Sequence, residues 1–199
     1  LFNYANKIGG IVVGTGDLSE LALGWATFNA DQMANYNVNA SVPKTMMAYL
    51  VRWYAQHRAQ TDLAVVLQDV LATPISPELI PPEDGEISQR TEGLVGPYEL
   101  HDFFLYHWLR HGATPTKIFH LARLSFDGLY SQEVIQHWML QFFRRFMTQQ
   151  FKRTTLPPGP KVGSVSLSPR GDWRMPDEAG FQHLLAEVSQ LLAHEEKAG

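Results

Sequence analysis

The chain has 199 residues, of which 45% are hydrophobic and 18% charged, a composition typical of a globular domain. Its formal net charge of -4 argues against a broad basic face for duplex nucleic acid, and the absence of cysteine excludes disulfides, thiolate nucleophiles and cysteine-ligated metal centres. No apolar run approaches the roughly 20 residues that a membrane-spanning helix needs. We therefore expect a cytoplasmic protein with neither nucleic acid nor a membrane as partner.

The first predicted elements are a strand and a helix joined by a short polar turn. Residues 8–13 are a β-branched run that predicts a parallel strand buried on both faces, which places Thr15 at its carboxyl end. Asp17 is a suitable N-cap, and Glu20 three positions later completes a capping box ahead of an apolar helical pattern. Open α/β sheets bind nucleotides at such turns, although the same local pattern also fits a plain helix cap.

The rest of the chain is predicted to be mostly helical. A loop over 29–39 leads into a helix with Ser41 as its N-cap and Pro43 in its first turn. Apolar spacing predicts helices over residues 41–57, 61–72, 97–111, 115–126, 131–153 and 177–194. The proline-rich connection over 73–96 is long enough to be a lid or a binding loop.

Four polar residues of the predicted helix over 97–111 have simple structural interpretations. His107 and His111 lie four positions apart and could share a metal ion, but the aromatic residues around them favour a packed helix with histidines at its edge. Glu99 and Asp102 fall near the start of the helix, where acidic side chains favour the helix dipole. We therefore expect these acids to act as helix caps.

Several separated segments, taken in order, resemble the synthetase domain of glutamine-dependent NAD synthetases. They are GTGDLSELALGW (14–25), YNVNASVPKT (36–45), TPISPEL (73–79), GPYELHDFF (96–104), QFKR (150–153) and LSPRGDWRMP (167–176). The resemblance implies an α/β fold, in which residues 1–199 form the C-terminal portion of an adenine nucleotide α-hydrolase-like domain. Such a domain is Rossmann-type with a parallel sheet, and this portion of it would be rich in helices.

The resemblance also implies an activity: a ligase that forms a C–N bond by ATP-dependent amidation of deamido-NAD to NAD. In this family the nicotinate carboxylate attacks the α-phosphate of ATP and releases pyrophosphate, and ammonia then displaces AMP from the NAD-adenylate. Both steps build negative charge, which magnesium and lysine would stabilise. The implied partners are ATP, deamido-NAD, ammonia delivered from glutamine by a glutaminase domain, and further copies of the chain in a homo-oligomer.

Matched positions carry over the family's site residues. The resemblance implies ATP contacts for Thr15, Lys44 and Ser76, and deamido-NAD contacts for Glu20, Trp25, Ala26, Thr27, Phe28 and Lys152. It places Glu20 beside magnesium and makes Lys44 and Lys152 the catalytic cations. Lys44 falls in the first turn of a predicted helix, where free backbone N–H groups would also attract phosphate. Lys152 falls at a helix C-terminus, where a cation is favourable even without a ligand.

The chain departs from the family pattern in two ways. Ala26 and Phe28 replace a small polar residue and a tyrosine, and Asn29-Ala30 stands where glycine is usual, which predicts altered substrate contacts. The chain also lacks a Ser-Gly-Gly-x-Asp-Ser pyrophosphate loop and a glutaminase domain with its cysteine. We therefore expect 1–199 to supply only part of the site and to be incomplete as an isolated chain. The alternatives are a non-catalytic nucleotide-binding or dimerisation module, and another ATP pyrophosphatase such as a GMP synthetase relative.

Overall fold

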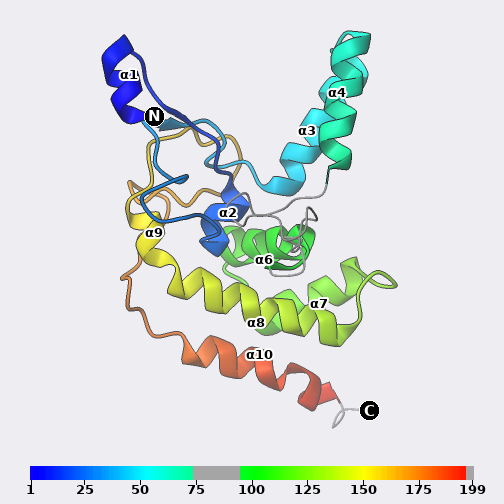
Figure 1. The fold of residues 1–199 in the computed structure, drawn as a ribbon. Helices are drawn as coiled ribbons and strands as arrows, with labels where there is room; N and C mark the ends of the chain where they lie inside the picture. The colour runs from blue at the N-terminus through cyan, green and yellow to red at the C-terminus, as the bar shows by residue number, and fades with distance from the viewer. Residues whose placement is uncertain (74–94, 196–199) are drawn as a thin grey trace, which may run out of the picture.

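The computed structural model describes residues 1–73 and 95–195, which form a helical body around a short parallel sheet (Figure 1). The elements are α1 (Phe2–Ile8), β1 (Val13–Gly14), α2 (Leu18–Leu23), β2 (Tyr36–Asn37), α3 (Lys44–His57), α4 (Thr61–Ala72), α6 (Tyr98–His111), α7 (Pro115–Ser125), α8 (Gln132–Thr148), α9 (Gln150–Thr154) and α10 (Gln182–Glu195). In the sheet, Val13 lies opposite Tyr36 and Gly14 opposite Asn37. The predicted combination of many helices with a parallel sheet is therefore present.

Helix α8 forms the centre of the hydrophobic core. Helices α6, α7 and α10 pack around it, and the short α2 contacts it from above in Figure 1. Its inward-facing side chains are almost completely buried, and they are Ile135, Met139, Phe142, Phe143 and Phe146. Because burying one such side chain contributes roughly 1.5–3 kcal/mol, this face holds the body together. The apolar stripe predicted for this helix is confirmed.

The predicted strand over residues 8–13 is mostly wrong. Residues up to Ile8 form α1, which ends at Gly9 with a left-handed φ of 67°. Only Val13 of the run pairs with β2, and Ile11 and Val13 are 65% and 54% exposed. The β-branched run has one strand to pair with in the described part of the chain, so it is neither long nor buried on both faces.

The helix predicted over 131–153 is divided into α8 and α9 by a break at Gln149. The break turns the guanidinium of Arg153 into the core, where it donates to the carbonyl oxygens of Leu21, Ala22 and Phe146. These carbonyls lie in the last turns of α2 and α8, where helices leave acceptors without partners. Burial lowers the pKa of Arg153 to about 9, so it remains charged at neutral pH.

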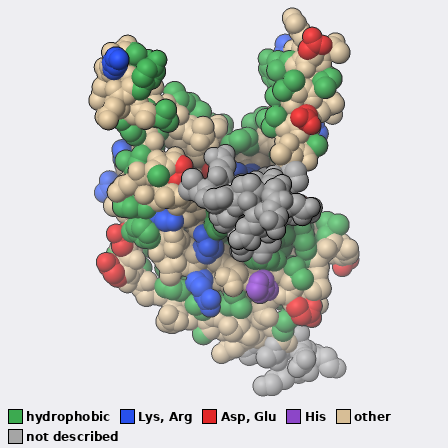
Figure 2. Space-filling view, viewed as in Figure 1, with side chains coloured by type: hydrophobic (Ala, Val, Ile, Leu, Met, Phe, Trp, Pro, Cys, Tyr) green, Lys and Arg blue, Asp and Glu red, His purple; other side chains and the backbone are tan. Residues whose placement is uncertain are grey.

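Helices α3 and α4 project from the body as a hairpin (Figures 1 and 2). Helix α3 contacts α2 and α6, whereas α4 packs against α3. Large apolar side chains are exposed along the hairpin, namely Met46, Tyr49, Leu50, Trp53, Tyr54, Leu63, Val65, Val66 and Val70. Over the described ranges, no helix has the length and the hydropathy needed to cross a membrane.

Candidate functional site

The turn from β1 to α2 has the predicted capping box. The Asp17 carboxylate accepts a hydrogen bond from the Glu20 N–H at 2.9 Å, and the Glu20 carboxylate accepts one from the Asp17 N–H at 3.2 Å. Asp17 is 1% exposed, whereas Thr15, directly after β1, is open to solvent. The two reciprocal bonds fix the orientation of Glu20 at the start of α2.

The ammonium group of Lys44 reaches this turn from α3. Its Nζ lies 2.9 Å from Asp17 Oδ2 and 2.7 Å from Glu20 Oε1. Burial alone would lower the pKa of Lys44, but the two carboxylates outweigh burial and raise it above its usual range. Burial raises the pKa of both Asp17 and Glu20, and Lys44 offsets this only in part. Two carboxylates share one ammonium, so the cluster has an excess of negative charge.

Ser41 does not cap α3, contrary to the sequence prediction. The N-cap is Pro43, which has no side-chain hydrogen bond to offer. The Ser41 hydroxyl instead donates to the carbonyl oxygen of Pro160 and accepts from the N–H of Val162. It therefore anchors the segment after α9 beside the start of α3.

Residues from two other helices satisfy the first N–H groups of α3. The Lys44 N–H donates to Ser19 Oγ at 2.8 Å, and the Thr45 N–H donates to Asp102 Oδ2 at 3.1 Å. Asp102 was predicted to cap the start of its own helix. The structure instead shows its carboxylate hydrogen-bonded to the first turn of α3. The sequence predicted that free N–H groups in this turn would attract phosphate. For these two groups the prediction is wrong, because Ser19 and Asp102 already accept their hydrogen bonds.

Lys152 lies at the other end of α2. Its Nζ donates to the carbonyl oxygens of Gly24 and Ala26, each at 2.7 Å. The guanidinium of Arg145 lies 5.0 Å from the centre of the Trp25 ring. Burial and the nearby Arg145 lower the pKa of Lys152. The structure therefore brings Lys152, Trp25 and Ala26 together, and adds an arginine that sequence reasoning did not single out.

The surface next to Lys152 is aromatic. The Phe28 and Phe151 rings lie 5.4 Å apart, and both side chains are about 40% exposed. Thr27 is exposed beside them, and its N–H donates to Asp31 Oδ1 at 2.6 Å. Asp31 was not among the predicted residues. Exposed aromatic rings can stack on a planar group, and the neighbouring cations can contact an anionic one.

The site residues form two clusters, separated by the length of α2. The first cluster is Asp17, Glu20 and Lys44, and the second is Trp25, Ala26, Arg145 and Lys152. The six residues of α2 span about 9 Å, so Lys44 and Lys152 mark opposite ends of one short helix. Ser76, the remaining predicted ATP contact, lies outside the described residues.

Two buried polar groups beside the first cluster were missed from the sequence. The Tyr98 hydroxyl and Asn37 Oδ1 are buried, and neither has a hydrogen-bond partner among the described residues. The Tyr98 ring lies 5.3 Å from Lys44 Nζ, and Asn37 packs against the backbone at Gly14 and Gly16. Both residues belong to segments that carry the family resemblance, which was the available signal.

A comparison with known families decides between the candidate identities. The family model described as NAD synthase matches residues 1–147. The chain belongs to the NAD synthase family. A glutamine-dependent NAD(+) synthetase from Mycobacterium leprae is 45% identical over 219 residues, which cover 98% of this chain and 32% of that protein. One from Mycobacterium tuberculosis (strain H37Rv) is 45% identical over 210 residues, covering 96% and 31%. The chain thus spans about a third of the length of these relatives.

A solved structure supports the fold of this NAD synthase family member. The glutamine-dependent NAD(+) synthetase from Cytophaga hutchinsonii matches with a TM-score of 0.70 and 20% sequence identity, covering 95% of this chain and 28% of that one. At this identity the likeness shows the fold alone. The family match also favours NAD synthase over other ATP pyrophosphatases.

The carboxylates of the first cluster suit magnesium only if Lys44 moves. Magnesium prefers oxygen ligands and is often held by one or two carboxylates together with water and phosphate. Each oxygen of Asp17 and Glu20 already accepts from Lys44 or from a backbone N–H. Glu20, 24% exposed in its side chain, is the more accessible of the two, and an ion bound at its Oε1 would replace the Lys44 ammonium.

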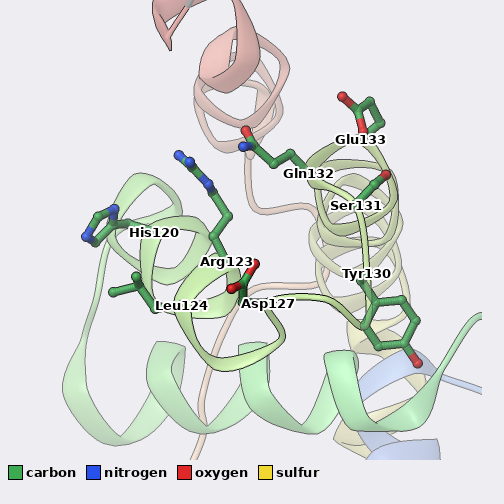
Figure 3. Close-up of a pocket in the computed structure, with 8 residues that line it drawn as sticks. All are labelled: His120, Arg123, Leu124, Asp127, Tyr130, Ser131, Gln132 and Glu133. Atoms are coloured by element: carbon green, nitrogen blue, oxygen red, sulfur yellow. The ribbon is translucent and has the colours of Figure 1, made fainter.

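Other parts of the NAD synthase chain offer weaker sites. A hollow of about 550 Å³ lies between α7 and the start of α8 (Figure 3). It is lined by eight residues, none of them a predicted site residue. The rings of His107 and His111 are 5.5 Å apart, but no group of three metal-ligating side chains occurs anywhere in the described ranges. Both features are separate from the clusters at α2.

Proposed function

We propose that the chain forms part of the active site of an NAD synthetase that amidates deamido-NAD with ATP and ammonia. One observation supports this proposal most strongly. Glu20 and Lys44 meet at one end of α2, and Lys152 and Trp25 lie at the other end. The parallel pairing of β1, which precedes this helix in the chain, with β2, which follows it, supports an adenine nucleotide α-hydrolase-like domain, of which residues 1–199 would be the C-terminal portion.

The proposed reaction forms and breaks bonds in two steps. A carboxylate oxygen of the nicotinate bonds to the α-phosphorus of ATP, and pyrophosphate leaves with the electrons of the broken P–O bond. The nitrogen of ammonia then bonds to the carbonyl carbon of the adenylate, the C–O bond breaks, and AMP leaves as ammonia gives up a proton. The nitrogen would come from glutamine through a glutaminase domain. Both transition states place negative charge on oxygens, so nearby cations accelerate both steps.

Each cluster supplies a different cation. The Lys44 ammonium, released from Glu20, is positioned to contact ATP phosphates beside Thr15. A magnesium ion on Glu20 would supply further neutralisation of phosphate charge when bound. The Lys152 ammonium has three donors, of which two are used by the carbonyls of Gly24 and Ala26. Its remaining donor can contact the anionic dinucleotide over the surface formed by residues 25–28.

Isotope transfer tests this function directly. The encoded protein that contains residues 1–199, with whatever sequence flanks them, is given ATP, magnesium, ammonium and deamido-NAD labelled with ¹⁸O in the nicotinate carboxylate. We expect NAD to form and one labelled oxygen to appear in AMP, because the C–O bond of the adenylate breaks. Label in inorganic phosphate together with ADP, or no NAD, would contradict the proposal.

The projecting α3–α4 hairpin supports self-association in a homo-oligomer. It exposes a continuous series of apolar side chains, of which Leu63, Val66 and Val70 share one side of α4. We propose a second copy of this chain as the occupant of the surface.

A charged substitution on the hairpin tests this association. Val66→Asp should convert the oligomer to a smaller species in light scattering coupled to gel filtration. Gln68→Asp adds the same charge on a different side of α4 and should leave the mass unchanged. An identical mass for the wild type and Val66→Asp would contradict the proposed interface.

A further inference from the structure

The first turn of α3 is tied to α2 and α6 by one carboxylate. Asp102 accepts a hydrogen bond from the Ser19 hydroxyl through Oδ1. Its Oδ2 accepts from the N–H of Thr45 at 3.1 Å and from the Thr45 hydroxyl at 2.7 Å. Ser19 in turn accepts from the Lys44 N–H at 2.8 Å. Asp102 therefore lies one hydrogen-bonded residue away from the backbone of Lys44.

Burial makes the placement of a charged Asp102 costly, and these bonds are the main terms that offset the cost. Burial raises its pKa, and Asp102 also raises the pKa of Asp17 through charge repulsion. Around the Lys44 ammonium there is thus a third carboxylate in an already negative cluster. Its favourable contacts are the hydrogen bonds to the two hydroxyls and to the N-terminal turn of α3, where a negative charge is stabilised, together with the weaker attraction of the Lys44 ammonium.

We propose that Asp102 is a positioning residue for Lys44. Through Ser19 and Thr45 it holds the first turn of α3 against α2, so that the Lys44 ammonium lies at Asp17 and Glu20. This inference rests on the proposed function, in which Lys44 contacts ATP phosphates. The position of the ammonium can also be tested without any catalysis.

The first test measures how fast the Lys44 amine is modified. The protein is reductively methylated with formaldehyde and borohydride, and each lysine is quantified by mass spectrometry. Asp102→Asn removes the negative charge and leaves one acceptor oxygen for the Ser19 hydroxyl and the two Thr45 donors, so we expect Lys44 to react about tenfold faster, as for the loss of one charged hydrogen bond. Glu99→Gln, in the same helix but outside the network, should react like the wild type.

Faster reaction of every lysine would reveal that Asp102→Asn has unfolded. In that case a second variant tests the inference. Thr45→Val removes one hydroxyl and keeps the backbone N–H, and it should also accelerate the reaction of Lys44. An unchanged Lys44 rate in the folded variants would overturn the inference.

The second test separates positioning from general stability by steady-state kinetics. For Asp102→Asn in the encoded protein we expect kcat to fall about tenfold and KM for deamido-NAD to stay at the wild-type value, because Lys152 lies at the other end of α2. If KM rises for both ATP and deamido-NAD and kcat does not fall, the role of Asp102 is merely structural and the inference is overturned. If the wild type forms no NAD, the proposed function fails, and the methylation result still decides the role of Asp102.

Discussion

Lys44 Nζ and Glu20 Oε1 lie 2.7 Å apart although the residues are 24 positions apart in the sequence. The contact connects the first residue of α3 with the first turn of α2, next to the open end of β1. The family resemblance implied an ATP contact for Lys44 and contacts with deamido-NAD and magnesium for Glu20, and the structure brings the two side chains together. Lys44 thus offsets part of the negative charge of the site that we propose for phosphate and magnesium.

Replacing Lys44 should destabilise the fold in a pH-dependent way. Lys44→Met leaves Asp17 and Glu20 without their cation, at a cost of about 2 kcal/mol in the free energy of unfolding. The folded-state pKa values of both acids then rise further, so the cost should be larger at pH 8 than at pH 5, where these carboxyls can bind protons. Urea unfolding at both pH values measures it.

Lys161→Met is the control for this comparison. The Lys161–Asp172 pair is a surface contact with the lysine side chain 50% exposed, so its loss should cost less than about 1 kcal/mol. Equal effects of the two substitutions would refute the importance of the Lys44 cluster for stability.

Gly24 should resist replacement by alanine for reasons that Gly112 does not share. Both have left-handed φ values, 60° and 59°, but a Cβ at Gly24 would lie 2.3 Å from Gln149 Cβ, whereas none of the described atoms lies within 4 Å of one at Gly112. We expect Gly112→Ala to cost about 1 kcal/mol for backbone strain alone and Gly24→Ala about 3 kcal/mol. Thermal unfolding compares them, and a similar loss in both would exclude the close packing at Gly24.

Arg153 should contribute more to stability than a neighbouring surface arginine. Arg153→Met leaves the buried carbonyls of Leu21, Ala22 and Phe146 without donors and should cost about 3 kcal/mol. Arg144→Met changes an exposed side chain of α8 and should alter the free energy of unfolding little. Chemical denaturation measures the free energy of unfolding of both variants. If both were as stable as the wild type, the proposed contribution of Arg153 to stability would be wrong.

His101 should make the fold weaken as the pH falls. Its Nε2 donates to the carbonyl oxygen of Val95, and burial lowers its pKa from 6.5 to about 4. Because the unfolded state binds the proton more readily, stability is complete above pH 6.5 and should decline by about 2 kcal/mol between pH 7.5 and pH 5. His101→Gln should lack this part of the decline in urea titrations. The same pH dependence in both proteins would contradict a neutral buried histidine.

The sequence predicted the features that are encoded locally. The capping box of Asp17 and Glu20 and the apolar face of α8 follow from residues within a turn or two of each other, and both are present. Asp102 could not be assigned this way. Its hydrogen bonds go to α2 and α3, and a cap supplied from another helix leaves no pattern in the local sequence.

Other incorrect sequence predictions also involve contacts between segments that are far apart in the sequence. Ser41 has the residue type of an N-cap, but its hydroxyl is taken by Pro160 and Val162, more than a hundred positions away. The helix over 131–153 is broken at Gln149, and the contacts that accompany the break join Arg153 to carbonyls of α2 and α8, of which those of α2 lie far away in the sequence. The roles of the site residues came from the family resemblance rather than from local spacing.

Binding of an ATP analogue tests the central claim most directly. The encoded protein is titrated calorimetrically with magnesium and a non-hydrolysable ATP analogue, alongside Lys44→Met and Lys161→Met. We predict that Lys44→Met weakens binding by at least about tenfold, as loss of a charged contact to phosphate requires, while Lys161→Met binds like the wild type. Equal affinity in all three proteins would contradict a phosphate site at Lys44.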